Sequence, residues 1–166
     1  MIVPFTAQEI ATLIDANFAS LLLFVRQWTC GNEGVAPEDV VQEAFLQLLR
    51  HSRKKGKPTQ PLAWLFRVAR NEAIARFRKK QRREKHEQQF CRERKDWFEP
   101  APDKNLQNEE LTEALEKLPL DHREIVVMRI WGELSFEEIA ELTATPKTTV
   151  FRQYNESLHV LKKILE

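Results

Sequence analysis

Side chains able to contact a nucleic acid gather in one short stretch, Leu134 to Tyr154, which reads LSFEEIAELTATPKTTVFRQY. Arginine and glutamine can donate hydrogen bonds to base edges, a phenylalanine ring can meet a thymine methyl group, and lysine pairs with phosphate. We expect the residues nearest a DNA groove to be Lys147, Thr148, Phe151, Arg152 and Gln153. Such contacts require a helix that presents these side chains together.

The spacing within this stretch predicts two helices separated by a tight turn. Ser135 and Glu138 have capping-box spacing, so a first helix should begin at Phe136. Pro146 should be the first residue of a second helix, because proline loses no hydrogen bond there. The face expected to be buried carries Val150, Tyr154, Leu158 and Leu161. The pattern is typical of a helix-turn-helix that reads a major groove, and it also fits a helical hairpin in a bundle.

The composition predicts an all-α protein. Of the 166 residues, 42% are apolar and 31% are charged, and runs of alternating β-branched residues are missing. We find no apolar run near the roughly 20 residues of a membrane span and no signal-peptide pattern, which predicts a cytoplasmic protein without membrane insertion. Cys30 and Cys91 stand alone, so neither a disulfide, a metal site nor a cofactor is expected.

The net charge of +1 conceals a segregation of charge along the chain. Residues 1–49 carry one basic and six acidic side chains, residues 50–95 carry seventeen and four, and residues 96–166 carry eight and fifteen. The middle segment is therefore strongly cationic, which suits a polyanionic partner.

A long helix is predicted within this cationic segment, from Pro61 through PLAWLFRVARNEAIARFRKKQRR. A sector of about 120° on this helix carries Trp64, Arg67, Arg70, Asn71, Arg78 and Arg82. Arginines can follow phosphates while an indole stacks on an exposed base, so the stripe suits single-stranded nucleic acid. Trp64 fits equally well as a partly buried aromatic packed on the preceding loop. That loop, within RHSRKKGKPTQ, is basic and could also meet a strand.

The preceding stretch, APEDVVQEAFLQLLRH, predicts another helix with Pro37 near its first turn. Its polar face carries Asp39, Gln42 and Glu43. An acidic patch would repel phosphate, so this face suits a protein partner with basic residues, although the residues alone favour a plain solvated face.

Taken in series, these stretches resemble a bacterial RNA polymerase sigma factor of the extracytoplasmic-function class of the sigma-70 family. PEDVVQEAFLQLLR is similar to region 2.2, which binds core polymerase, and PLAWLFRVARNEAIARFRKK is similar to regions 2.3 and 2.4, which open and hold the promoter minus-ten element. Residues 111–164 are similar to region 4, whose helix-turn-helix reads the minus-thirty-five element. The resemblance covers residues 15–165 in the family's order.

This resemblance implies two helical domains, residues 1–84 and 108–166, with residues 85–107 as a flexible linker. Core RNA polymerase and promoter DNA are the implied partners, and an anti-sigma factor stays open as a third. The acidic face would bind polymerase, the basic stripe the minus-ten element and the second helix of the helix-turn-helix the minus-thirty-five element. No catalytic residues are expected, since the four histidines stand in no recognisable catalytic motif. The alternative is a helix-turn-helix regulator that acts without polymerase.

Two departures from the family pattern fall in the helix-turn-helix. Basic residues that commonly follow the Thr-Val pair are replaced by Gln153, Asn155 and Glu156, which predicts weak DNA binding because phosphate contacts are lost. Ala144 stands where the family often has glycine, and an alanine there is strained if its φ is positive.

Overall fold

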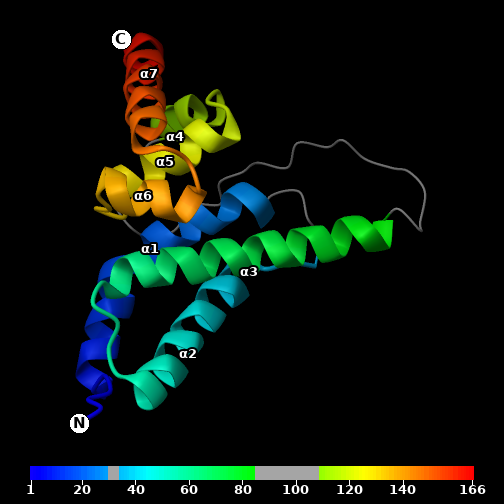
Figure 1. Ribbon diagram of the computed structural model, residues 1–166. Helices are drawn as coiled ribbons and strands as arrows, with labels where there is room; N and C mark the ends of the chain where they lie inside the picture. Colours follow the sequence, from blue (N-terminus) through cyan, green and yellow to red (C-terminus); the bar gives the residue numbers. More distant parts are fainter. Residues whose placement is uncertain (30–33, 85–108) are drawn as a thin grey trace. The chain divides into compact units, whose positions relative to one another are not determined.

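The computed structural model describes residues 1–29, 34–84 and 109–166, and within these ranges every regular element is an α-helix (Figure 1). The chain divides into two compact units, residues 1–97 and 98–166. The predicted all-α class with two helical domains is thus confirmed. The linker expected at residues 85–107, together with Cys30 and Cys91, lies outside the described residues.

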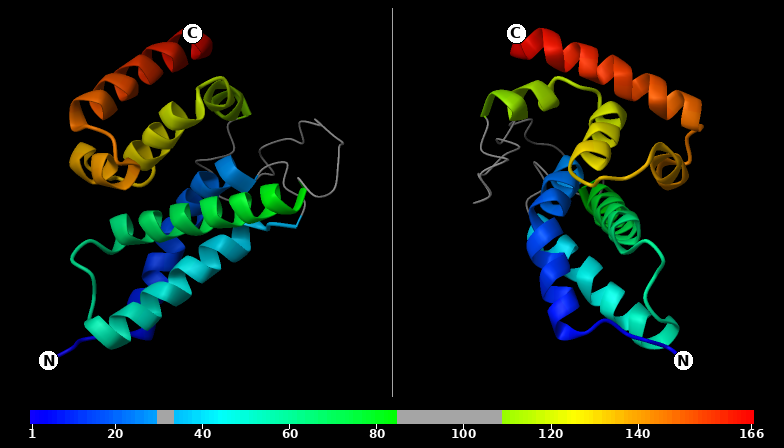
Figure 2. Two further views of the ribbon diagram at one scale, coloured as in Figure 1. Left: turned by 45° about the vertical axis from the view of Figure 1, so that its right-hand side comes forward. Right: turned by 90° about the vertical axis from the view of Figure 1, so that its left-hand side faces the viewer.

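The first unit contains α1 (Ala7–Thr29), α2 (Pro37–Lys55) and α3 (Pro61–Glu84), each of which packs against the other two (Figure 2). Helices α2 and α3 both begin at a proline, as predicted, because proline is tolerated where the amide has no helical partner. The ring of Phe24 lies at the centre of the core, with its centroid 4.9 Å from those of Trp28 and Phe66. Burial of these aromatic rings holds α1 and α3 together.

Helix α1 modifies one expectation from the sequence. By length and composition it could cross a membrane, since its most apolar 18-residue window has a mean hydropathy of 1.3. The core helix of a soluble protein passes the same test. The residues from Leu21 to Val25 are buried, and α1 packs on α2 and α3, so it contributes to the core of the first unit.

The second unit contains α4 (Glu109–Glu116), α5 (Leu120–Ile130), α6 (Phe136–Thr143) and α7 (Lys147–Leu165). Helix α7 packs against the other three, and its buried residue Val150 joins a core that includes Ile125, Met128 and Ile139. Arg123 donates hydrogen bonds of 2.8 to 3.1 Å to three carbonyls, those of Leu115, Glu116 and Leu118. It thereby satisfies carbonyls that the end of α4 leaves without helical donors.

The helix-turn-helix forms as predicted at its first helix and its turn. The Ser135 hydroxyl accepts from the Glu138 amide at 3.1 Å, and the Glu138 carboxylate accepts from the Ser135 amide at 2.6 Å. Helix α6 therefore begins at Phe136 with a complete capping box. Ala144 closes the helix in the left-handed region with φ 51°, the strained conformation expected of an alanine at a glycine position.

Two details of α7 differ from the prediction. Helix α7 begins at Lys147, and Pro146, with ψ 137°, is its N-cap and not its first helical residue. Leu158, expected to be buried, is 37% exposed, whereas Ser157 beside it is fully buried. The Ser157 hydroxyl donates to the Gln153 carbonyl at 2.6 Å and lies 3.2 Å from Nδ1 of His122 on α5. Because its hydroxyl is hydrogen-bonded, the serine can occupy the seam between α5 and α7.

Candidate nucleic-acid interface

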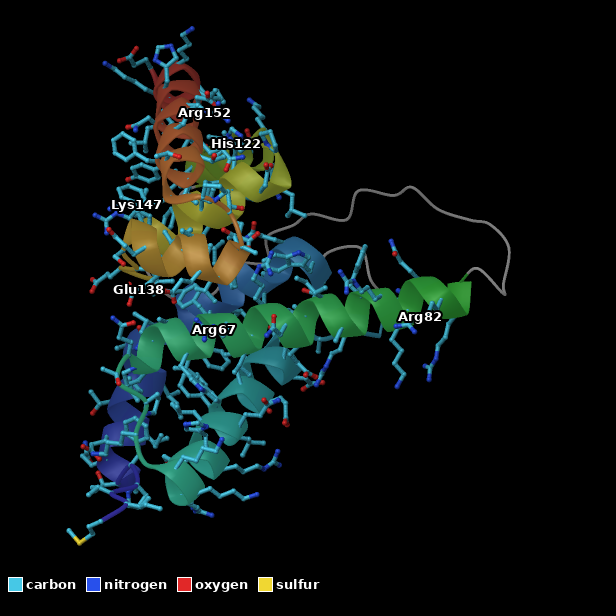
Figure 3. The ribbon with its side chains drawn as sticks, in the orientation of Figure 1. Arg67, Arg82, His122, Glu138, Lys147 and Arg152 are labelled. Carbon is cyan, nitrogen blue, oxygen red and sulfur yellow. The ribbon has the colours of Figure 1, made fainter. Side chains whose placement is uncertain are left out.

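The basic stripe predicted on α3 forms along the outside of the first unit. Arg67, Asn71, Arg78 and Arg82 are exposed, and Arg70 is half-buried. Arg67 lies in the first half of the helix and Arg82 near its far end (Figure 3), a span of 15 residues or about 22 Å at helical rise. Eight of the 24 residues of α3 are basic and two are acidic. The helix therefore presents a long cationic track.

Two exposed arginines lie near the end of this track. Arg78 and Arg82 form no ion pair with any residue in the described ranges, whereas Arg76, on the same helix, is paired with Glu72 at 2.7 Å. A guanidinium without a carboxylate neighbour keeps its full charge for phosphate. This part of α3 thus carries positive charge that no described carboxylate compensates.

Trp64 packs on α2, which the sequence did not indicate. Its ring centroid lies 5.3 Å from that of His51, with the planes tilted by 49°. The two rings border a shallow cavity of about 290 Å³ that is also lined by Gln47, Arg50, Lys54 and Lys55. Trp64 is therefore half-buried, as one of the two interpretations expected, but against a helix and not the loop. Its indole remains partly accessible beside the basic residues that line this cavity.

The acidic face predicted on α2 is present but partly neutralised. Asp39 and Gln42 are exposed, and no described residue forms an ion pair with Asp39. The Glu43 carboxylate is half-buried and accepts from Arg50 at 3.1 Å and from Gln47 at 3.3 Å. A partner that binds this face would therefore meet the full charge of Asp39, whereas the charge of Glu43 is partly neutralised by its ion pair with Arg50.

The five residues predicted on the second helix of the helix-turn-helix do not share one face of α7. Thr148 and Arg152 lie opposite the buried Val150, on the outward side of the helix. Phe151, 53% exposed, lies toward α6, where its ring centroid is 5.3 Å from that of Phe136. Lys147 is also on that flank, whereas Gln153 is on the opposite flank and donates to Asp121 of α5 at 3.0 Å.

Carboxylates accompany the cations of this helix. The Lys147 ammonium forms a close ion pair with Glu137 of α6, and this hydrogen bond lowers the pKa of the Glu137 carboxyl. Arg152 lies 3.8 Å from Glu156, one turn along α7. Residues 133–156 contain five carboxylates and two cations. The sequence did not indicate the roles of Glu137 and Asp121, because these residues lie 10 and 32 positions from their partners Lys147 and Gln153.

Comparisons with known families cover most of the described helices. Residues 13–83 match the family Sigma-70 region 2, and residues 108–158 match the family Sigma-70, region 4. The two matches coincide with the two units and include the basic stripe and the helix-turn-helix. Together they define a promoter-recognition subunit of bacterial RNA polymerase.

Individual relatives agree with these matches. The chain is 24% identical over 124 residues to the RNA polymerase sigma factor SigV of Bacillus subtilis (strain 168), covering 75% of this chain and 72% of that protein. It is 28% identical over 129 residues to the ECF RNA polymerase sigma factor EcfG of Rhodopseudomonas palustris (strain TIE-1), covering 77% and 70%. The chain belongs to the sigma-70 family and, with these relatives, to its extracytoplasmic-function class. It is a sigma factor, which directs core polymerase to promoters.

Two solved structures share the fold. The sigma factor RpoE of Bartonella quintana, crystallised with the anti-sigma factor NepR, matches with a TM-score of 0.71 and 20% identity over 96% of this chain and 98% of that chain. CnrH, in complex with the cytosolic domain of CnrY, matches with a TM-score of 0.56 and 21% identity over 96% of this chain and 89% of that chain. At these identities the likeness concerns the fold alone.

Proposed function

We propose that this sigma factor uses three separate surfaces, one for core polymerase and two for promoter DNA. The observation that carries the proposal is the cationic stripe of α3, which lies in the unit matching region 2 and ends in Arg78 and Arg82 without carboxylate partners among the described residues. A sigma factor needs such a surface to hold a separated DNA strand, because each exposed guanidinium can neutralise one phosphate.

The minus-ten element binds along α3 in this proposal. Trp64 stacks on an unpaired base, and Arg67, Arg70, Asn71, Arg78 and Arg82 follow the backbone away from it. The accessible part of Trp64 beside His51 and the nearby Lys54 supports a base at this end of the track. The base would be held between an aromatic face and cations that pair with its phosphate.

The minus-thirty-five element binds at α7. Arg152 and Thr148, on the outward side, approach the groove most directly, and Phe151 contacts a thymine methyl group from the flank. Lys147 and Gln153 are each held by a carboxylate, so they contribute only after exchanging that partner. This arrangement supports weak binding of duplex DNA by the second unit alone.

Core polymerase binds the face of α2 that carries Asp39, Gln42 and Glu43. Reversing both carboxylates, Asp39→Lys with Glu43→Lys, should weaken assembly with core polymerase by about tenfold or more, because the partner's basic residues would meet like charge. Co-purification with core enzyme measures the effect, and circular dichroism checks that the helices are intact. The matched control is Glu113→Lys with Glu116→Lys, an equal charge change on α4, which should assemble normally. Equal assembly of both double variants would reject this surface.

The remaining roles follow from the family. Phosphoryl transfer is left to the polymerase, so this chain acts as a non-catalytic specificity subunit in the cytoplasm. The solved structures of RpoE and CnrH each contain a second protein chain, the anti-sigma factor NepR or the cytosolic domain of CnrY. An anti-sigma factor is therefore a natural third partner of this chain. The proposed domain limits are residues 1–84 and 108–166, which limited proteolysis can check.

Transcription with purified components tests the proposal. Core polymerase is incubated with a library of genomic fragments with and without this chain, and the 5′ ends of the transcripts are sequenced. The chain should produce new start sites that share two upstream motifs. The alternative regulator would instead shift free duplex DNA in a gel without core enzyme and create no new start sites. That second pattern would reject the proposed function.

A further inference from the structure

The first nine residues contact the loop that joins α2 to α3. The Lys57 ammonium donates to Oε1 of Glu9 at 2.5 Å across 48 residues of sequence, and it lies 5.2 Å from the centroid of the Phe5 ring. A Cβ atom added to Gly56 would lie 4.0 Å from Cγ2 of Ile2, so the Ile2 side chain is close to the backbone of the loop. Two contacts of Lys57 and the proximity of Ile2 to Gly56 thus connect residues 1–9, here called the N-terminal arm, to loop 56–60.

Both carboxylate oxygens of Glu9 accept hydrogen bonds in this arrangement. Oε2 accepts from the Thr6 amide at 2.8 Å, and the Thr6 hydroxyl accepts from the Glu9 amide at 3.2 Å, which forms a capping box at the start of α1. Oε1 remains for Lys57. The hydrogen bond from Lys57, followed by that from Thr6, lowers the pKa of Glu9 to about 2. The carboxylate is therefore charged throughout the physiological range, and its geometry is fixed by the helix start.

The loop that the arm contacts leads directly into the proposed strand-binding helix. Gly56 has a φ of 84°, which favours glycine, and Trp64 donates from its amide to the Gln60 carbonyl at 3.0 Å as α3 begins. Lys57 is the last basic residue before α3, yet its side chain is only 31% exposed. Its ammonium is thus held between a carboxylate and an aromatic face, in the loop that precedes the cationic track.

We propose that the N-terminal arm is an electrostatic latch on loop 56–60, in which Glu9 holds Lys57 and competes with a nucleic-acid phosphate for the Lys57 ammonium. The proposal rests on the proposed function, which assigns α3 to a DNA strand. Binding exchanges one ionic partner of Lys57 for another, so the latch lowers affinity for any strand, whatever its sequence. Selectivity then depends more on contacts to bases, since unspecific phosphate binding is reduced.

The substitution Glu9→Gln opens the latch with little disturbance of the helix. Glutamine can still accept from the Thr6 amide in the capping box, but it carries no charge for Lys57. Binding of the full-length chain to a dye-labelled 20-nucleotide single strand of mixed sequence is measured by anisotropy between 50 and 200 mM salt. We expect Glu9→Gln to bind about threefold more tightly at 0.1 M salt and to steepen the logarithmic salt dependence by about 0.7, the contribution of one additional phosphate contact on a single strand.

Two controls separate the latch from a general charge effect. Asp15→Asn removes one negative charge at an exposed position of α1 and should bind like the wild type. In a chain that already carries Lys57→Gln, adding Glu9→Gln should change nothing. The latch is refuted if Glu9→Gln binds no more tightly than Asp15→Asn, or if it still strengthens binding in the Lys57→Gln background.

A second measurement needs no DNA. Brief acetylation with an amine-reactive reagent, followed by mass spectrometry, should modify Lys57 more slowly than Lys54 and Lys55, and Glu9→Gln should remove the difference. Equal rates in the wild type would overturn the latch. The two proposals also fail differently: if the wild type does not bind the strand, the assignment of α3 is wrong, whereas normal strand binding that Glu9→Gln does not strengthen rejects the latch alone.

Discussion

Helices α3 and α7 both present cationic side chains to the outside, but these side chains have different neighbours. On α3 there are eight basic and two acidic residues, and the exposed Arg78 and Arg82 have no ion-pair partner in the described parts of the chain. In the helix-turn-helix, carboxylates outnumber cations five to two between residues 133 and 156, and Lys147 and Arg152 each lie beside a glutamate.

The difference indicates that the two units bind DNA in different ways. A surface rich in arginines and poor in carboxylates gains affinity from the release of counterions, irrespective of sequence. A surface whose cations are paired with carboxylates gains little from phosphate, and it depends on contacts to base edges and on being held near the DNA by the rest of the complex. We therefore expect the first unit to supply most of the affinity and the second to contribute selectivity.

A large effect should follow loss of Arg78 and Arg82, which have no ion-pair partner among the described residues. Arg78→Gln with Arg82→Gln should weaken binding of a single strand about tenfold at 0.1 M salt and reduce the logarithmic salt slope by about 1.4, since two phosphate contacts are lost. Anisotropy titrations over a range of salt concentrations measure both quantities. A slope equal to that of the wild type would mean that the end of α3 does not contact the strand.

The next effect concerns base reading by α7. Arg152→Ala should weaken promoter binding by about 1 to 3 kcal/mol and relax preference at one or two base pairs, which lowers promoter-specific transcription. Lys147→Ala should weaken binding to all sequences alike. Transcription from a set of minus-thirty-five variants measures the two profiles. If Arg152→Ala leaves both the level and the profile unchanged, α7 does not read bases through this residue.

A smaller effect should follow release of Lys147 from Glu137. The lowered pKa of Glu137 means that this carboxylate stays charged as the pH falls through its usual range, so the ion pair is intact at neutral pH. Glu137→Gln should therefore raise affinity for duplex promoter DNA about threefold and steepen the salt slope by about 0.9. Glu133→Gln, an equal charge change just before α6, is the matched control. Equal gains from both variants would show a general charge effect.

The smallest effect concerns stability and compares the two units directly. Ala144→Gly should stabilise the second unit by about 0.5 kcal/mol, because relief of the left-handed alanine slightly exceeds the greater freedom of glycine when unfolded. Ala75→Gly, at an exposed position inside α3, should destabilise the first unit by about 1 kcal/mol. Thermal unfolding followed by circular dichroism measures both changes. A loss of stability in Ala144→Gly would contradict the strain inferred from its backbone.

Several features of the fold could be predicted from short-range patterns. The capping box at Ser135, the proline starts of α2 and α3, and the buried faces of the helices depend on residues no more than four positions apart. The location of the start of α7 was missed by one residue, because proline fits both the N-cap and the first helical position. Leu158 was assigned to the core because periodicity alone does not show which neighbour the helix meets.

The sequence by itself determined the helical class, the order of the sigma-family motifs and the residue types available on each surface, since these follow from local spacing and composition. The tertiary structure alone decided which charges from different elements meet. Glu9 and Lys57 are 48 residues apart, and Trp64 finds His51 on another helix, so no local pattern predicts either contact. Long polar side chains can reach several partners, and only the packing of the helices selects the one with which each of them pairs.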